Sequence, residues 1–127
     1  MSMSRSYTRI VSAEDGSSAF EDAELDLSEQ PMGDGAPPMF VGSLGAGHGA
    51  AFVQFAAFHG DPHPASEPQW VIVLRGIIEV EVSDGTSRRF GPGDLVLATD
   101  TSGRGHITRV VGDTPFEGLG IPSMPAG

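Results

Sequence analysis

Glycine and proline recur along most of this sequence and limit the length of any regular element. The 127 residues include 18 glycines and 10 prolines, a composition that favours short strands and turns over long helices. After residue 49, β-prone runs alternate with turn signals such as Asp84-Gly85. The expected strands occupy Ala50–Phe58, Gln69–Arg75, Ile77–Val82, Thr86–Phe90, Leu95–Ala98, His106–Val111 and Phe116–Ile121. Many short antiparallel strands predict an all-β sandwich or barrel.

The N-terminal third has a different character. Residues 14–34 carry eight acidic side chains and no basic one, and their apolar positions are too sparse for an amphipathic helix. We therefore expect an extended arm with an acidic outer face. The predicted division is an N-terminal arm with lead-in strands at 1–49, a barrel core at 50–121 and a C-terminal tail at 122–127. Because an extended arm can add a strand to a sheet edge, we expect a homodimer.

Composition excludes several classes of function. The net charge of −10 disfavours binding to nucleic acid or to a membrane surface, because both are anionic. There is no cysteine, and all seven basic residues are arginine, so thiolate and lysine chemistry are excluded. The first residues have no apolar core of the kind found in a signal peptide, and the apolar run Trp70–Leu74 is too short to span a bilayer. We expect a soluble, cytoplasmic protein.

A few polar side chains beside the predicted strands are candidates for a functional site. With cysteine absent, a metal site would need histidines together with carboxylates or amides. His63 and Gln69 stand before and at the start of the most β-prone run, and His106 begins a later one. Arg104 and Arg109 flank His106 and are candidates for holding an anionic ligand, because guanidinium groups bind anions through charge-assisted hydrogen bonds. With Gln69, the two arginines form the predicted ligand pocket.

The spacing of these residues resembles a known family. Gln69 is followed by six residues and Gly76, then by a hairpin, the turn Gly91-Pro-Gly-Asp94 and a histidine at 106. This order is similar to the two-part signature of the cupins, and most similar to small single-domain bacterial cupins. The resemblance covers residues 50–121. It implies a small β-barrel (a double-stranded β-helix, or jelly roll), with a site inside the mouth of the barrel.

The resemblance also implies a metal site, which this sequence retains only in part. Cupins often hold Fe, Mn, Ni or Zn through three histidines and a glutamate. His63 matches the first histidine, Ala65 stands in place of the second, Gln69 stands in place of the glutamate, and His106 matches the last histidine. Loss of one histidine and of the carboxylate predicts weak binding of a divalent metal, since even loss of outer-shell support lowers metal affinity about 10–100-fold.

Two neighbouring residues can replace the missing metal ligands, so more than one function is consistent with the sequence. Glu67 and His59 lie close in sequence to His63 and are reserve ligands. The first hypothesis is a module that binds a small molecule in the barrel, with a degenerate metal site. The alternative is a metal-dependent oxygenase, isomerase or lyase that uses His63 and His106. A third is a metal-free epimerase with His63 or His106 as the base.

Overall fold

The structure is a computed structural model that describes residues 3–31, 33, 35–47, 49–56 and 62–124. The described residues form eleven strands and no helix, which confirms the predicted all-β class. In this part of the chain there is accordingly no helix long and apolar enough to cross a membrane. The strands are β1 Met3–Ser12, β2 Ser18–Gln30, β3 Met39–Val41, β4 Ala46–Gly47, β5 Ala51–Phe55, β6 Gln69–Arg75, β7 Ile77–Val82, β8 Ser87–Phe90, β9 Leu95–Ala98, β10 His106–Val111 and β11 Phe116–Met124.

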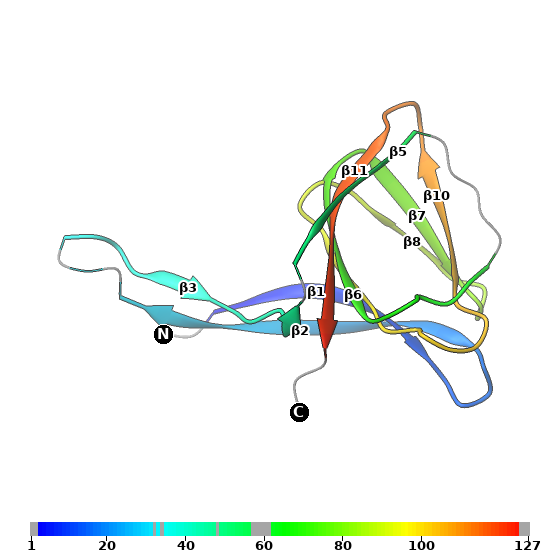
Figure 1. Cartoon of the computed structure of the whole chain (residues 1–127), viewed down its shortest axis with the longest axis horizontal. Coiled ribbons are helices and arrows are strands. Elements are labelled where there is room, and N and C mark those ends of the chain that lie inside the picture. The colour runs from blue at the N-terminus through cyan, green and yellow to red at the C-terminus, as the bar shows by residue number, and fades with distance from the viewer. Residues whose placement is uncertain (1–2, 32, 34, 48, 57–61, 125–127) are drawn as a thin grey trace.

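Two sheets face one another in the body of the molecule (Figure 1). The larger sheet has the order β3-β2-β1-β9-β6-β11-β4, with β5 paired to β11, and the smaller sheet has the order β10-β7-β8. Apolar side chains from both sheets fill the space between them, among them Val73 and Val96 from the larger sheet and Val80 and Phe90 from the smaller one. This arrangement is the small β-barrel that the strand pattern predicts, and its described strand pairs are antiparallel apart from the parallel pair β1–β9.

Strand β7 shows why its sequence folds as a half-buried strand. Ile78, Val80 and Val82 are buried in the core, whereas Glu79 and Glu81 alternate with them on the outer face. Successive side chains of a strand point to opposite faces, so the pattern IIEVEV fixes which face is inside. Outside, paired cations offset the carboxylates: Arg89 contacts Glu79 at 3.1 Å, and Arg109 contacts Glu81 at 3.0 Å.

Turns occur where glycines in the sequence predict them. In the β7–β8 hairpin, Gly85 has a φ of 94°, in the left-handed region that glycine enters readily. Asp84 accepts hydrogen bonds from the hydroxyl and the backbone N–H of Thr86, and these bonds hold the pKa of the Asp84 carboxyl below its ordinary value. In the β8–β9 turn, the Asp94 carboxylate accepts a hydrogen bond from Gly91 N–H at 2.8 Å.

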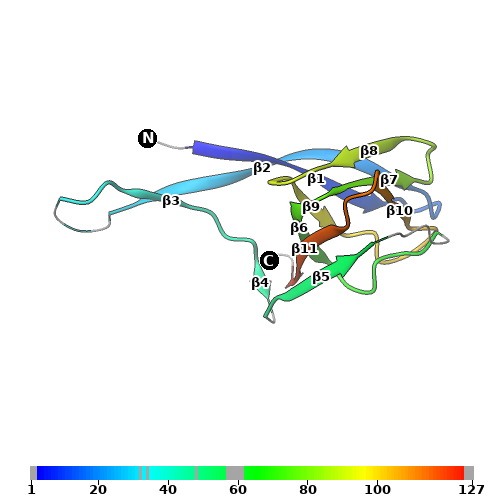
Figure 2. The same cartoon turned by 90° about the horizontal axis from the view of Figure 1, so that it is seen from above.

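The N-terminal segment forms a long hairpin. Strands β1 and β2 pair from Met3↔Leu27 to Ser12↔Ser18, and β1 joins the body through parallel pairing with β9 over Thr8–Ile10. The turn end of the hairpin lies against the body, and the opposite end, together with β3, projects away from it in both views (Figures 1 and 2). We call this projecting part the arm. It consists of residues 3–7 of β1, residues 23–30 of β2, and β3.

Three segments meet tightly around Gly105, just before β10. The hydroxyl of buried Ser18 donates to the Gly105 carbonyl at 2.5 Å, and Arg104 N–H donates to the Gly16 carbonyl at 2.9 Å. On the other side, a Cβ at Gly105 would lie 2.0 Å from the carbonyl carbon of His63. The β1–β2 turn and the segment at His63 therefore both pack against Gly105, the residue directly before His106.

Gly105→Ala should lower the free energy of unfolding by more than about 2 kcal/mol. Its φ of 71° is unfavourable for a residue with a side chain, a cost of about 1–2 kcal/mol, and the methyl group displaces the backbone at His63 and Pro64. Denaturant unfolding measures the loss. Gly85→Ala is the matched control, because Gly85 also has positive φ but has nothing within 4 Å of the added Cβ. Equal losses in the two variants would contradict the close approach at Gly105.

Candidate functional site

A cavity of about 190 Å³ lies between the two sheets. Strands β5, β6 and β11 form one wall, and β7 and β10 form the other. Its lining is mostly apolar, with three polar side chains. The apolar and glycine positions are Val53, Phe55, Val71, Ile78, Phe116, Gly118, Leu119 and Gly120, and the polar ones are Gln69, His106 and Thr108. An apolar cavity with a few convergent polar groups is the usual form of a small-molecule site.

Two glycines of β11, Gly118 and Gly120, line this space. A Cβ at Gly118 would lie 2.6 Å from the ring of Phe116 and 2.8 Å from the Ile72 carbonyl oxygen, so that position admits only glycine. At Gly120 an added Cβ would meet Val53 and Gln69 at ordinary distances of 3.7 and 3.8 Å. Gly120 therefore leaves space that a larger side chain would fill.

The aromatic floor of the cavity comes from two facing strands. The rings of Phe55 on β5 and Phe116 on β11 stack with centroids 4.7 Å apart, and the two residues are partners in the strand register. Phe116 is buried, and Phe55 packs against the core cluster. Stacked aromatic pairs stabilise by about 0.5–1.5 kcal/mol beyond the area they bury, so this side of the cavity has a fixed shape.

A buried carboxylate orients His106. Asp100 has an exposed fraction of 0%, and its Oδ2 lies 2.6 Å from His106 Nδ1. The backbone of Asp100 is held by Ala65, whose N–H donates to the Asp100 carbonyl at 2.9 Å. A carboxylate at Nδ1 selects the ring form that carries its proton there. In that ring form Nε2 carries no proton and is the nitrogen that can accept a hydrogen bond from a ligand.

The second oxygen of Asp100 is unusual. Oδ1 is buried and has no hydrogen-bond partner within the described part of the chain. Buried polar atoms are nearly always hydrogen-bonded, so this oxygen is an exception next to the carboxylate oxygen that holds His106. Sequence reasoning did not single out Asp100, because no local pattern separates a buried aspartate from the surface aspartates of this acidic chain.

The structure brings some of the predicted metal ligands together. His63 and His106 form an isolated β-bridge through both backbone N–H groups, at 3.2 and 3.0 Å, and their ring centroids lie 5.6 Å apart. Gln69 shares the cavity with His106. His63 is exposed, and its Nδ1 lies 3.1 Å from the Pro64 carbonyl oxygen. It does not line the cavity between the sheets.

The remaining reserve ligands do not complete a metal centre among the described residues. Glu67 is exposed, and His59 lies outside the described residues. Ala65, at the position of the missing histidine, is part of the buried core. Residues 62–124 and the other described segments contain no group of three His, Cys, Asp or Glu side chains placed to hold a metal ion. Two neighbouring histidines and a neutral amide lack the third histidine or the anionic carboxylate or thiolate that a zinc site normally includes.

The two predicted anion-binding arginines lie away from this cavity. Arg109 points to the outer face of β10, where its guanidinium contacts Glu79 at 3.4 Å and Glu81 at 3.0 Å. Arg104 lines a separate hollow of about 270 Å³ that also reaches His106. His106 is therefore shared by two hollows, whereas Gln69 belongs only to the one between the sheets.

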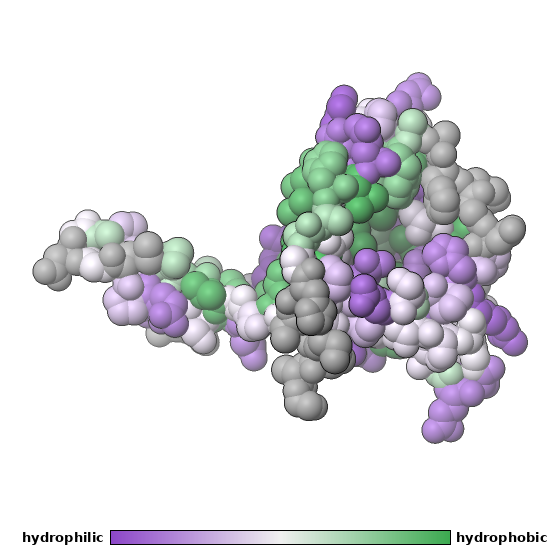
Figure 3. Space-filling view, in the orientation of Figure 1, coloured by the Kyte–Doolittle hydropathy of each residue, from purple (hydrophilic) through white to green (hydrophobic). Residues whose placement is uncertain are grey.

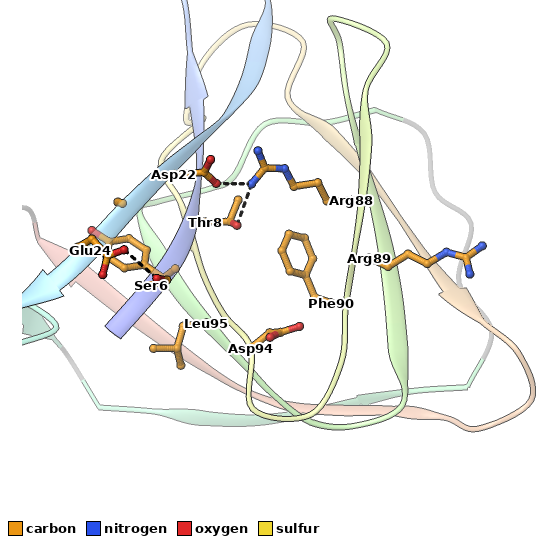
Figure 4. Close-up of a pocket in the computed structure, with 11 residues that line it drawn as sticks. Ser6, Thr8, Asp22, Glu24, Arg88, Arg89, Phe90, Asp94 and Leu95 are labelled. Atoms are coloured by element: carbon orange, nitrogen blue, oxygen red, sulfur yellow. Dashed lines mark hydrogen bonds and ion pairs between the residues drawn. The ribbon is translucent and has the colours of Figure 1, made fainter. Parts of the chain in front are cut away.

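A larger groove of about 670 Å³ lies between the arm and β8 (Figure 4). Several of its polar side chains form hydrogen bonds or ion pairs with one another. Arg88 contacts Asp22 at 2.7 Å and Thr8 at 3.2 Å, and Ser6 donates to Glu24 at 2.7 Å. The two contacts of Arg88 join β8 to the hairpin, so the groove is the boundary between the hairpin and the body. The smaller, less polar cavity is the better candidate site.

Comparisons with known proteins add little about function. No model of a protein family matches the sequence, and no curated protein matches it. A solved structure with a detectable similarity is a protein from Salmonella typhimurium that carries the provisional name ethanolamine utilization protein Q. The two chains are 13% identical, the match covers 95% of this chain and 97% of that one, and the TM-score is 0.44. We infer no function from a similarity of this size.

Proposed function

We propose that this protein binds a small molecule in the cavity between its sheets. The observation that carries the proposal is the pairing of a mostly apolar cavity with an imidazole oriented by a buried carboxylate. The resemblance of residues 50–121 to cupins supports the same location, inside the mouth of the barrel. In this arrangement the apolar part of the ligand packs on Phe55 and Phe116, and its polar group meets His106 and Gln69.

The cavity sets the size of the ligand. A volume of about 190 Å³ corresponds to roughly six water molecules at liquid density, below the range of drug-sized sites. The ligand class is therefore a compact molecule with one polar end, such as a short-chain acid, alcohol or amide. Gln69 offers both a donor and an acceptor, and His106 Nε2 accepts a hydrogen bond when neutral and donates one when protonated.

A second candidate, weak binding of a divalent metal, has one observation in its favour. Asp100 holds His106 in the manner in which carboxylates orient metal-ligating histidines. His63, His106 and Gln69 are the residues that would hold Fe, Mn, Ni or Zn, and such an ion would act there as a Lewis acid. Because this set contains no anionic ligand and only two histidines, we propose that the site is degenerate and that the small molecule is bound without a resident metal.

The first prediction of this proposal concerns two neighbouring histidines. A thermal-shift screen of compact acids, alcohols and amides should give ligands that raise Tm of the wild-type protein. His106→Ala should weaken their binding by about tenfold or more, since one hydrogen bond to a charged or polar ligand is lost. His63→Ala should leave it unchanged, because His63 does not line the cavity. Titration calorimetry of the three proteins measures the difference.

Gly120→Ala separates cavity binding from binding elsewhere. The added methyl group makes ordinary contacts with Val53 and Gln69, so the variant should fold while the cavity becomes smaller. It should bind the same ligands more weakly than wild type. Ligands that bind equally well to wild type, His106→Ala and Gly120→Ala would place their site outside this cavity and overturn the proposal.

The second prediction concerns metal content. Protein purified without added metal should contain far less than one Fe, Mn, Ni or Zn ion per chain, because two histidines and an amide bind such ions weakly. Elemental analysis measures this directly. One tightly held ion per chain, lost in both His63→Ala and His106→Ala, would instead support the metal-dependent enzyme.

A further inference from the structure

The cavity between the sheets has three polar side chains along its described wall, and they differ in what they offer a ligand. Gln69 and Thr108 can each donate or accept a hydrogen bond, because an amide carries both kinds of group and a hydroxyl can rotate. His106 is different, because a neutral imidazole donates through one ring nitrogen and accepts through the other. The ring form of His106 therefore decides which polar groups the cavity accepts.

Asp100 determines that ring form. Its Oδ2 lies 2.6 Å from His106 Nδ1, and its Oδ1 has no partner. Among the described residues, the His106 ring is thus the one hydrogen-bond donor to a carboxylate that is fully buried. A proton on Nε2 instead would place two acceptors side by side and leave the buried carboxylate without any hydrogen bond, which is strongly unfavourable. The ring proton therefore lies on Nδ1.

The second ring nitrogen is left for a ligand. Nε2 of His106 makes no hydrogen bond with the described part of the chain, and it is not one of the fully buried atoms. The described residues that line the cavity include no arginine, so no guanidinium is placed there to neutralise an anionic ligand. The carboxylate behind the ring carries a negative charge itself. The free polar group of this wall is therefore an acceptor, in surroundings that disfavour an anion.

We propose that Asp100 makes the cavity selective for neutral hydrogen-bond donors, namely compact alcohols and primary amides. The inference rests on the proposed function, because it specifies which molecules the cavity binds. The O–H or N–H of the ligand donates to His106 Nε2, and its apolar part packs on Phe55 and Phe116. Figure 3 shows the apolar surface gathered over β5 and β11, the strands that carry these two rings.

Ketones and carboxylates of the same shape are the molecules that this arrangement rejects. Both present only acceptors, so their lone pairs meet the lone pair of His106 Nε2. A site built around one hydrogen bond discriminates against an analogue that cannot make it, because its own buried polar group is then left unpaired. Asp100 touches no ligand in this scheme. It is a positioning residue that sets specificity through the imidazole.

Nitrogen-15 NMR at pH 8 tests the ring form directly, since the chemical shifts of the two ring nitrogens show which of them carries a proton. The His106→Ala variant identifies the signals of this ring. We expect the proton on Nδ1 in the wild-type protein. Asp100→Asn should move it to Nε2, because an amide N–H at this place donates to Nδ1. Asp113→Asn, which removes the same charge from the exposed β10–β11 turn, is the matched control and should leave the spectrum of His106 unchanged.

Either of two NMR results would overturn the proposal. One is a wild-type ring that carries a proton on Nε2, because that nitrogen would then donate. The other is a proton that stays on Nδ1 in Asp100→Asn, because Asp100 would then not determine the ring form. If Asp100→Asn does not fold, as judged by circular dichroism, the wild-type spectrum and the wild-type ligand preference decide the proposal by themselves.

Two pairs of compounds of matched shape test the selectivity. 2-Butanol should bind the wild-type protein about tenfold more tightly than 2-butanone, and butyramide should exceed butyrate by at least as much, since each preferred compound adds one hydrogen bond. NMR titration measures the four dissociation constants. Asp100→Asn should reverse the order of 2-butanol and 2-butanone, because Nε2 then donates, whereas Asp113→Asn should keep the wild-type order.

The titrations separate failure of this inference from failure of the proposed function. Equal affinities within each pair, weakened alike by Gly120→Ala, would place the compounds in the cavity and overturn only the selectivity. Absence of binding by all four compounds, or binding that Gly120→Ala leaves unchanged, would contradict the cavity as the binding site and overturn both.

Discussion

The close approach of three backbone segments at Gly105 determines the geometry of the site. The β1–β2 turn reaches Gly105 through the hydroxyl of Ser18, and the segment at His63 lies so near that no Cβ fits between them. Because His106 follows directly and its N–H donates to the His63 carbonyl at 3.0 Å, the start of β10 is fixed from two sides. The position of His106 thus depends on residues that are more than 80 positions away in sequence, such as Ser18.

The cavity lowers the packing density of the interior beside β11. Interiors of proteins are normally filled to about 0.74–0.76 of their volume, and β11 departs from this by placing glycine at 118 and 120 on the inward side. Gly118 is required by the ring of Phe116 and by the β6 backbone, whereas Gly120 has room for a methyl group. Close packing therefore explains only the first of the two glycines.

Local sequence patterns predicted most strands of the body. Features that depend on contacts between distant segments could not be predicted in this way. Gln69–Arg75, Ile77–Val82, Leu95–Ala98 and His106–Val111 occur as expected, because alternation and glycine turns are encoded within a few residues. The acidic segment was expected to be extended, but its pairing with β1 over ten register positions depends on a partner strand. Asp100 was missed for a similar reason, since its burial results from three segments that meet in space. The resemblance to cupins implied one site for Gln69 and His106, and both line the cavity, whereas the outward direction of Arg109 depends on its contacts with Glu79 and Glu81 of a neighbouring strand.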